Sequence, residues 1–421
     1  MSELKNELAI LVSIAESGSK VSECEISLDE LERLLNTAGA TAFARVIQVK
    51  DSFDPRTCIG KGKVAEISEI CKANSITLVV FDFELSPMQI RNLEADIGNV
   101  TVIDRSMLIL DIFALHAVSG EGKLQVELAQ LKYSAPRLTG HGIELSRQGG
   151  GIGSRGPGES KLETDRRHLH EKIVALESKL ADLEHNRAIM RAQRDRSGLP
   201  KIAIVGYTNA GKSTLLNKIT NAGVLAEDKL FATLDATTRK HVLDSGETIL
   251  LTDTVGFVRK LPHHLVKAFK STLDEVKYSD ILLIVVDSND SEAANQLKVT
   301  EEVIEELGAE DKPRIYVYNK ADKLSQEEIP FIKDNSVLVS AKTGKGIDEL
   351  LGKIESILKE SKKEYVLLIP YDSQSKINLI YKEYTVLETE YSDDGIFVKC
   401  ILDEKGRGMY KAYITDADGE K

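Results

Sequence analysis

The sequence has few cysteines, no tryptophan and no long apolar run. Its four cysteines, Cys24, Cys58, Cys71 and Cys400, lie far apart and form no Cys-x-x-Cys motif. This spacing argues against a zinc site and a disulfide framework, and it fits a reducing cytosol. No stretch approaches the roughly 18 apolar residues of a transmembrane helix, and the start of the chain is unlike a signal peptide. We therefore expect a cytoplasmic protein without a membrane span, and peripheral membrane association stays open.

The chain also has a deficit of positive charge, with 55 Lys and Arg against 67 Asp and Glu. The deficit is not uniform. Residues 122–201 contain 15 Lys and Arg but 10 Asp and Glu, so this segment carries +5 and the remainder carries −17 of the net −12. A basic segment in an acidic protein indicates a polyanionic partner. A solvated helix face would explain the same charges, and composition alone leaves both interpretations open.

A glycine-rich motif predicts a phosphate-binding loop. Residues 206–213 match the pattern G-x-x-x-x-G-K-[ST], between an apolar strand at 201–205 and a helix that follows. Backbone N–H groups at a helix start wrap a polyphosphate, and the helix dipole favours its negative charge. Lys212 is expected to contact the β- and γ-phosphates, and the Ser213 hydroxyl to bind Mg²⁺. The nucleotide contacts expected in this loop are Gly206, Tyr207, Thr208, Asn209, Ala210, Gly211, Lys212 and Ser213.

Three further motifs, at residues 253–256, 319–322 and 340–342, follow in order, and each comes after an apolar strand. Together they predict a GTPase domain of the translation-factor class. Asp253 is placed to hold Mg²⁺ through water, and the Gly256 N–H to approach a γ-phosphate. Asp322 can accept hydrogen bonds from guanine N1–H and N2–H₂, a donor pair that adenine lacks. A backbone N–H in residues 340–342 would bind guanine O6. The expected contacts are Asp253, Thr254, Val255, Gly256, Asn319, Lys320, Ala321, Asp322, Ser340, Ala341 and Lys342.

Between these motifs, a threonine should supply the second Mg²⁺ ligand and sense the γ-phosphate. Residues 230–239 contain three threonines. Thr233 is favoured because it lies roughly midway between the fixed motifs, and Thr237 is the alternative. The expected catalytic residues are therefore Lys212, Thr233 and Gly256, and the expected metal ligands are Ser213 and Thr233. The neighbours expected around the nucleotide are Phe231, Ala232, Leu234 and Asp235.

Two residues bear on the rate of hydrolysis. Phe257 follows Asp-x-x-Gly, where many signalling GTPases have a water-orienting glutamine. A phenyl ring cannot hydrogen-bond water, so we expect hydrolysis that is slow alone or is completed by a partner. Asn209 lies inside the phosphate loop, where some GTPases use an asparagine to ligate K⁺ in place of an arginine finger. A K⁺ ligand and a simple loop-capping asparagine both remain open.

Residues 119–197 are predicted to form a helical stalk. No proline or glycine interrupts residues 159–196, and their apolar residues recur at heptad spacing. A shorter seam over 124–135 ends at Pro136, so we expect two antiparallel helices. Their connection, residues 139–158, contains eight glycines, which allow close approach to another surface. A basic tip of this kind suits a probe that reaches into RNA, and a plain linker is the alternative. The basic residues in or beside it are Arg137, His141, Arg147, Arg155 and Lys161.

Two smaller domains are predicted on either side of the stalk and a GTPase domain at residues 198–361. Residues 1–118 alternate strands, near 8–14, 42–49, 76–81 and 100–103, with helices signalled at Ser27 and Pro87. This pattern predicts a small α/β domain with a mainly parallel sheet. The run Gly60–Lys63 precedes a helix and fits an N-cap turn better than an anion site. Residues 362–421 predict a small α+β domain with strands near 365–369, 385–390 and 396–402 and a helix near 374–383.

The whole arrangement resembles the HflX family of ribosome-associated GTPases. The similarity is carried by five segments and covers roughly residues 5–360; the segments are 122–131, 158–163, 206–213, 231–235 and 253–257. The C-terminal appendage is similar to a fold found in a C-terminal domain of elongation factor G. Ala236 departs from the family pattern, in which a proline is expected, so this loop is expected to be more mobile.

The resemblance implies a GTP hydrolase, with GTP, GDP and Mg²⁺ as ligands, that binds the large (50S) ribosomal subunit and splits stalled or idle ribosomes under stress. Its glycine-rich loop would reach rRNA near the peptidyl-transferase centre. Ribosomes would stimulate a low basal rate, and the free protein would be a monomer. A binding switch or scaffold, for example a regulator of a membrane protease, is the rival interpretation, and it does not need the basic stalk.

Overall fold

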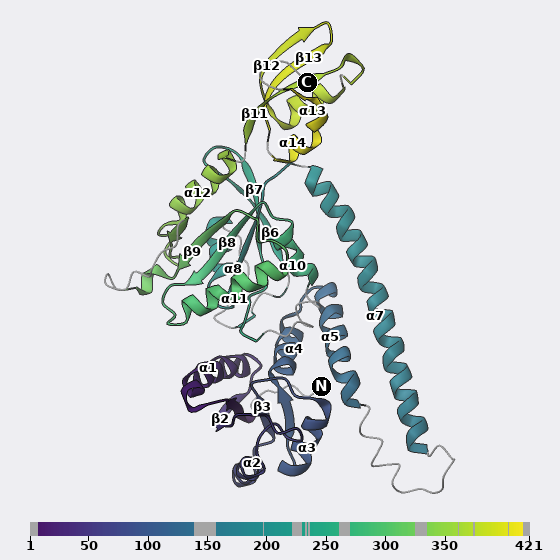
Figure 1. The fold of residues 1–421 in the computed structure, drawn as a ribbon, viewed down its shortest axis with the longest axis vertical. Coiled ribbons are helices and arrows are strands. Elements are labelled where there is room, and N and C mark those ends of the chain that lie inside the picture. Colours follow the sequence, from purple (N-terminus) through teal and green to yellow (C-terminus); the bar gives the residue numbers. More distant parts are fainter. Residues whose placement is uncertain are drawn as a thin grey trace.

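In the computed structural model, the chain forms three separate sheets, and a long two-helix stalk connects the first to the second (Figure 1). The structure describes residues 7–138, 157–196, 198–220, 230–231, 234, 236–260, 270–324, 335–360, 362–373, 375–402 and 404–415. No helix in these ranges is both long enough and apolar enough to cross a bilayer.

The N-terminal sheet contains four parallel strands in the order β2-β1-β3-β4. These strands are β1 (Leu8–Ala15), β2 (Thr41–Val49), β3 (Leu78–Phe81) and β4 (Thr101–Asp104). One face packs against α1 (Val21–Thr37) and α4 (Arg105–His116), and the other against α2 (Lys61–Asn74) and α3 (Pro87–Ile97). The prediction of a small α/β domain with a parallel sheet is confirmed.

Of the two helix starts predicted in this domain, the one at Pro87 is confirmed and the one at Ser27 is wrong. Ser86 caps α3 through a reciprocal capping box with Gln89, and Pro87 is its first residue, as predicted. Gly60 is the N-cap of α2. The predicted start at Ser27 is wrong, because α1 begins six residues earlier and buries Ser27 in its middle. Residues 21–26 contain no glycine or proline, so the helix extends back to the short turn that follows β1.

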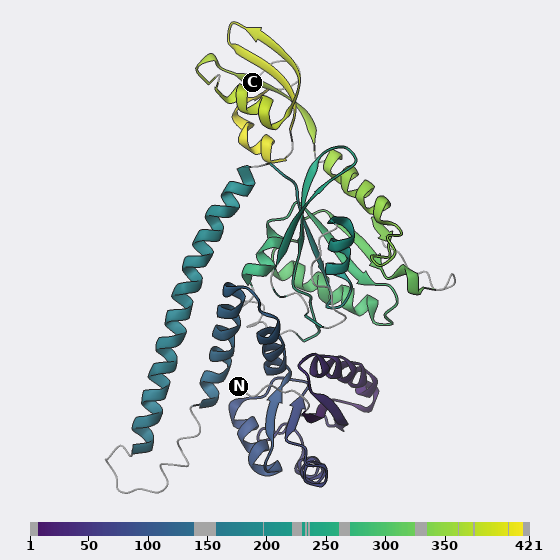
Figure 2. The same cartoon turned by 180° about the vertical axis from the view of Figure 1, so that it is seen from behind.

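The stalk consists of α5 (Gly120–Leu138) and the much longer α7 (Pro157–Arg196), which run antiparallel (Figures 1 and 2). Ion pairs of 2.7 Å join them at Lys132–Glu177, Glu127–Lys172 and Glu121–Arg187. Two predicted ends are wrong by two residues. α5 continues past Pro136, since a proline in the last turn removes only one hydrogen bond, and α7 begins at Pro157, a favoured first position. Most of the predicted tip, residues 139–156, lies outside the described residues.

The central sheet contains six strands in the order β10-β9-β8-β5-β7-β6, of which β6 alone is antiparallel to its neighbour among the described pairs. These strands are β5 (Lys201–Gly206), β6 (Thr237–Val242), β7 (Thr248–Asp253), β8 (Ile281–Asp287), β9 (Arg314–Asn319) and β10 (Ser336–Leu338). One face is covered by α8 (Lys212–Thr220) and α12 (Ile347–Glu360), and the other by α10 (Lys270–Lys277) and α11 (Ala293–Glu306).

The C-terminal domain is an antiparallel sheet in the order β12-β13-β11-β14, with helices on one face. Its elements are β11 (Lys363–Ile369), α13 (Ser375–Glu383), β12 (Thr385–Ser392), β13 (Gly395–Leu402), α14 (Glu404–Met409) and β14 (Ile414–Thr415). The predicted α+β appendage is confirmed in its order of elements. It lies beyond the central domain, opposite the N-terminal domain (Figure 1).

Candidate functional site

The phosphate loop lies at the carboxyl end of β5 and leads into α8, which is where open α/β sheets bind ligands. Gly206 has φ +148°, and an added Cβ would lie 2.3 Å from the Val285 carbonyl oxygen of the neighbouring strand. Gly211 has φ +95°, and its added Cβ would lie 2.3 Å from the Asn319 amide nitrogen. Both positions therefore require glycine, which explains the fixed glycines of the motif.

Lys212 points back into its own loop. Its Nζ donates hydrogen bonds to the carbonyl oxygens of Gly206 at 3.2 Å and Tyr207 at 2.9 Å. The side chain is buried, and burial lowers the pKa of Lys212 to about 8, partly offset by Asp253. The ammonium group is thus held at the centre of the loop by two neutral carbonyl oxygens. A bound phosphate chain would supply the negative charge that these carbonyls lack.

The lowered pKa of Lys212 predicts a pH-dependent affinity for GDP. A bound phosphate favours the charged amine, so binding takes up a proton and the affinity falls as the pH rises through about 8. Between pH 7.0 and 8.5 the protonated fraction falls roughly fourfold, and we expect the GDP association constant to fall by a similar factor. Titration calorimetry measures this change. Lys212→Arg should flatten it because a guanidinium stays charged, and an equal pH dependence in both proteins would contradict the assignment.

Ser213 and Asp253 meet across the β5–β7 edge. The Ser213 hydroxyl donates to Asp253 Oδ2 at 2.5 Å, and the Asp253 side chain is fully buried at the end of β7. One hydroxyl and one carboxylate oxygen at this distance are the hard oxygen donors that Mg²⁺ prefers. The residues present therefore fit the metal that the sequence motif predicts.

The segment after Asp253 pairs with the phosphate loop through its backbone. The Phe257 N–H donates to Gly206 O at 3.2 Å, and the Thr208 N–H donates to Phe257 O at 2.8 Å. An added Cβ at Gly256 would lie 2.6 Å from Thr208 Cα and 2.9 Å from Lys212 Nζ. Only a glycine can come this close, so Gly256 is positioned beside the predicted phosphate site. The Phe257 ring is buried in the core and does not face that site.

The two predicted base-reading motifs converge on the phosphate loop. Asn319 donates to Ala210 O at 2.9 Å and accepts from the Ala341 N–H at 2.9 Å, so it ties three loops together. Ser340 donates to Asp322 Oδ1 at 2.5 Å, and this hydrogen bond lowers the pKa of Asp322 and keeps it ionised. Lys320 has a left-handed backbone with φ +65°, and its Nζ pairs with Asp287 at 2.7 Å.

The intervening threonine segment is described only in part. Ala232, Thr233 and Asp235 lie outside the described residues, so the structure does not place the expected second metal ligand. Phe231 and Leu234 are buried, and the Phe231 N–H donates to Thr208 Oγ1 at 2.9 Å. The alternative, Thr237, begins β6 opposite Asp253.

The remaining predicted contacts follow the motifs in space. Asn209 is exposed in the loop with φ +62°. Thr254 and Val255 are buried beneath the loop, and the Thr254 hydroxyl donates to Ile204 O at 2.8 Å. Ala321 and Lys342 belong to the two predicted base-reading loops, and the Ala321 N–H donates to Val339 O at 3.0 Å. Hydrogen bonds thus join the phosphate loop to the segment after β7 and to both of these loops.

The sequence patterns missed a set of contacts between the N-terminal domain and this site. Glu30 accepts hydrogen bonds from the Tyr207 hydroxyl in the phosphate loop and from Arg105. Asp82 pairs with Arg105 at 2.9 Å and with Lys260 at 2.5 Å. Nearby, the Phe113 ring packs edge-to-face on Phe231 at 4.7 Å. The partners are up to 178 residues apart in sequence, so no local pattern points to them.

The buried pair within this network predicts a large effect on stability. Arg105 and Asp82 are 2% and 0% exposed, and without Arg105 the buried Asp82 carboxylate keeps only the half-exposed Lys260 as an ion-pair partner among the described residues. We expect Arg105→Ala to lower the free energy of unfolding of the N-terminal domain by about 3 kcal/mol. Arg56→Ala is the control, since Arg56 pairs with Asp96 on the surface and should contribute about 0.5 kcal/mol. Urea denaturation measures both, and equal losses would contradict the prediction.

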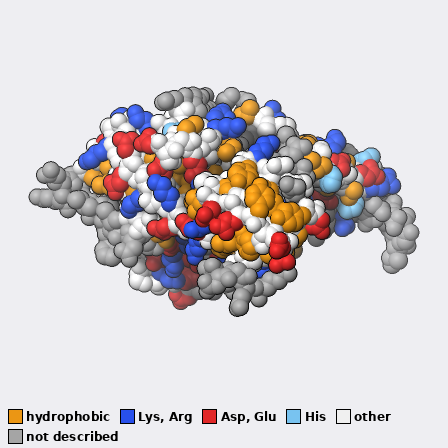
Figure 3. All heavy atoms as spheres, turned by 90° about the horizontal axis from the view of Figure 1, so that it is seen from above, with side chains coloured by type: hydrophobic (Ala, Val, Ile, Leu, Met, Phe, Trp, Pro, Cys, Tyr) orange, Lys and Arg blue, Asp and Glu red, His pale blue; other side chains and the backbone are white. Residues whose placement is uncertain are grey.

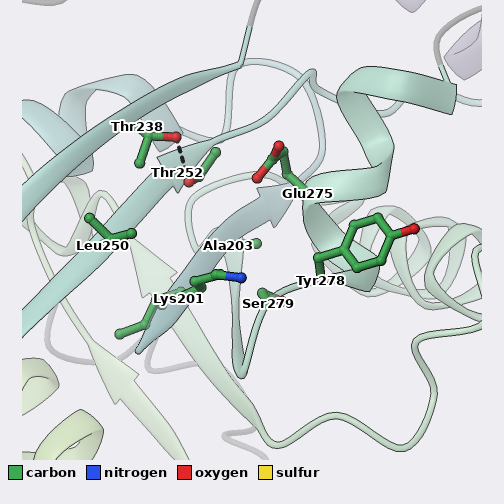
Figure 4. Close-up of a pocket in the computed structure, with 9 residues that line it drawn as sticks. Lys201, Ala203, Thr238, Leu250, Thr252, Glu275, Tyr278 and Ser279 are labelled. Atoms are coloured by element: carbon green, nitrogen blue, oxygen red, sulfur yellow. Dashed lines mark hydrogen bonds between the residues drawn. The ribbon is translucent and has the colours of Figure 1, made fainter. Parts of the chain in front are cut away.

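A hollow in the structure lies apart from this site. It is lined by the start of β5 and by residues of β6, β7 and α10, near the amino end of β5 (Figure 4). The Thr238 and Thr252 hydroxyls form a hydrogen bond of 2.9 Å beside it. The motif residues are at the opposite end of the strand, so this hollow is not the predicted nucleotide site.

Comparison with known proteins assigns a family to each part of the chain. Residues 25–114 match the family described as GTP-binding GTPase N-terminal, and residues 116–194 match GTP-binding GTPase Middle Region. Residues 201–320 match 50S ribosome-binding GTPase, and residues 330–405 match the HflX C-terminal domain.

Full-length relatives agree with these matches. GTPase HflX of Lacrimispora saccharolytica is 52% identical over 99% of this chain and 98% of its own length. GTPase HflX of Escherichia coli is 43% identical over 92% of this chain and 91% of its own length. Among solved structures, the SsGBP–GDP complex is 26% identical, covers 84% of this chain and 99% of its own, and has a TM-score of 0.45. The chain therefore belongs to the HflX family of GTPases.

Proposed function

We propose that this GTPase binds the large ribosomal subunit and separates stalled or idle ribosomes into subunits during stress. The observation that carries the proposal is the attachment of a 40-residue helix, paired with a shorter one, directly to the strand that leads into the phosphate loop. This stalk lies in the basic part of the chain. A rigid basic arm on a nucleotide switch suits mechanical work on RNA. The name of the matched family, 50S ribosome-binding GTPase, and the cytoplasmic location of ribosomes agree with this function.

The site residues are assigned roles from their positions. Lys212 and the N–H groups at the start of α8 would bind the β- and γ-phosphates, and Asp322, Ser340 and Ala341 would bind guanine. Ser213 would ligate Mg²⁺ directly, with Thr233 as the second ligand and Asp253 through water. The metal, when bound, neutralises charge on the β- and γ-phosphates. Gly256 lies close to Lys212 Nζ, and its N–H would contact the γ-phosphate and report its presence to the N-terminal domain.

The stalk is proposed to contact rRNA. Its tip, with Arg147 and Arg155, would approach the peptidyl-transferase centre, and the helices would hold it at a fixed distance from the GTPase domain. Binding to rRNA through basic side chains has a strong salt dependence because counterions are released. We infer that the free protein is a monomer and that it acts when it is bound to the ribosome.

Cosedimentation tests the proposed function. Purified protein locked with a non-hydrolysable GTP analogue is centrifuged with purified large subunits, with small subunits and with free 23S rRNA. We expect stoichiometric binding to large subunits in the GTP-analogue state and weak binding with GDP. A protein that ignores large subunits in both states would overturn the proposal and favour a scaffold that acts elsewhere.

The position of Phe257 predicts that turnover is slow without the ribosome. Its ring is buried and cannot orient the attacking water, so a partner must supply this function. We expect large subunits to raise kcat on the order of 100-fold or more. A steady-state phosphate-release assay measures this effect, and a fast enzyme that is indifferent to ribosomes would contradict it.

A further prediction concerns K⁺ at the phosphate loop. Asn209 is exposed in a left-handed conformation at the loop position that can ligate the ion. If it does so, exchanging K⁺ for Na⁺ should slow turnover several-fold, and Asn209→Ala should abolish the difference between the two salts. A variant that keeps the full K⁺ preference would leave Asn209 as a loop cap.

A further inference from the structure

Three segments of the proposed nucleotide site meet at Thr208 in the phosphate loop. The Thr208 N–H donates to Phe257 O at 2.8 Å, in the segment after β7. The Thr208 hydroxyl oxygen accepts from the Phe231 N–H at 2.9 Å, in the segment before β6. Thr208 and Phe231 are 6% and 2% exposed, so their contact is internal, unlike the apolar side chains that the C-terminal domain exposes in Figure 3. We call Thr208 and Phe231 the threonine joint.

The threonine joint is packed from two sides. An added Cβ at Gly256 would lie 2.6 Å from Thr208 Cα and 2.9 Å from Thr208 Cβ, so the segment after β7 lies directly on the threonine. On the other side, the Phe231 ring packs edge-to-face on Phe113 of α4, with ring centroids 4.7 Å apart. Phe231 is therefore fixed through its backbone by the phosphate loop and through its ring by the N-terminal domain.

The backbone of Phe231 is in a conformation that bulky residues rarely adopt. Its φ of +58° lies in the left-handed region. Such a conformation is unfavourable and persists only where the surrounding contacts over-determine it, which happens most often at functional sites. Here the contacts are the hydrogen bond to Thr208 and the burial of the ring. The joint thus determines the direction in which the chain leaves Phe231.

This direction bears on the expected second metal ligand. Thr233 follows Phe231 by two residues and lies outside the described residues. Two residues span at most about 7 Å, so a fixed Phe231 confines the Thr233 hydroxyl to a small volume beside the phosphate loop. Confining a reacting group before the reaction removes part of the entropic cost of bringing it into place.

We propose that Thr208 is a positioning residue for GTP hydrolysis, whose hydroxyl holds Phe231 so that Thr233 is placed at the metal. The side chain acts through its acceptor oxygen and not through contact with the nucleotide. The inference rests on the proposed roles of Ser213 and Thr233 as metal ligands, and it does not depend on ribosome binding. Loss of the hydroxyl should therefore impair the use of Mg²⁺ and turnover while nucleotide affinity persists.

Hydrogen exchange tests the joint in protein free of metal and nucleotide. Thr208→Val removes the acceptor and keeps a branched side chain, whereas Thr208→Ser keeps the hydroxyl. Exchange at the Phe231 amide is followed by mass spectrometry with fragmentation to single residues. We expect this amide to exchange about fivefold faster in the valine variant and at the wild-type rate in the serine variant. Equal rates in wild type and Thr208→Val would overturn the inference.

Magnesium titration of GTP hydrolysis tests the consequence. We expect Thr208→Val to raise the Mg²⁺ concentration for half-maximal turnover and to lower kcat, each about fivefold, and Thr208→Ser to restore both. The affinity for GDP without Mg²⁺ should change less than about twofold. Thr208→Ala gives the same test if the valine variant does not fold.

Thr300→Val is the matched control. It removes an equally buried threonine hydroxyl, which donates to Gln296 O at 2.9 Å within α11, and it should leave all of these quantities at their wild-type values. An unchanged Mg²⁺ dependence in Thr208→Val would overturn the inference. An equal loss of GDP affinity and kcat would do so as well, because Thr208 would then only stabilise the loop. A protein that does not bind large subunits would overturn the proposed function and leave this inference standing.

Discussion

Replacing Asp322 by asparagine is expected to invert the base preference of the enzyme from GTP to xanthosine triphosphate. The aspartate carboxylate would accept from guanine N1–H and N2–H₂. An asparagine amide keeps one acceptor, for N1–H, and its NH₂ group faces guanine N2–H₂ but matches the second carbonyl of xanthine. Hydrogen bonds to charged groups contribute about 1.5–3 kcal/mol each, so losing one and making the other neutral should weaken GTP binding on the order of a hundredfold. Competition between labelled GTP and unlabelled nucleotides measures the preference directly.

The hydrogen bond between Ser340 and Asp322 provides the control for this experiment. Ser340→Ala removes the neighbour that orients the carboxylate but keeps the acceptor pair, so it should weaken GTP binding without changing the base preference. The pKa of Asp322 lies below its usual value because of this hydrogen bond, and the carboxylate stays ionised at every pH relevant to the test. If Asp322→Asn still prefers GTP by the original margin, Asp322 does not read the base.

The residues of the proposed nucleotide site could be located in the sequence because each of them belongs to a short motif. Gly206, Gly211 and Gly256 are required by close approaches of backbone and side chains that only glycine permits. These close approaches require glycine at fixed positions within each motif, so the motifs can be recognised in the sequence. The strand before each motif could also be predicted, since each motif comes after a short apolar run that is typical of a strand buried on both faces.

The contacts of this site with the N-terminal domain could not be predicted in the same way. Glu30 and Arg105 lie on helices of a separate sheet, and Tyr207 is in the phosphate loop. An ion pair or hydrogen bond leaves no periodic signal, because any charged residue on the right face would serve. The false start at Ser27 has a related cause. A capping pattern is local, and residues 21–26 contain no glycine or proline that would stop the helix from extending back to the turn after β1.

Deleting the tip of the stalk is expected to abolish ribosome splitting while leaving the nucleotide site intact. Residues 149–156 are the deletion of choice, because α7 begins at Pro157 and its first turn is thereby kept. The described nucleotide-site residues form their hydrogen bonds within the central domain and with the N-terminal domain, so GTP affinity should change less than about twofold. Subunit binding should weaken only in part, since both helices and the outer domains keep their contacts.

Splitting should respond far more strongly than binding, because the missing residues are those that would enter the peptidyl-transferase region. We expect the rate of subunit separation, followed by light scattering of 70S particles, to fall by a factor on the order of 100, equivalent to about 2.7 kcal/mol of activation free energy. Arg147→Ala with Arg155→Ala keeps the length of the tip and removes two charges. This variant should lose affinity and show a flatter salt dependence, because fewer counterions are released on binding. A deletion mutant that splits ribosomes at the wild-type rate would show that the stalk tip does no mechanical work, whatever its effect on affinity.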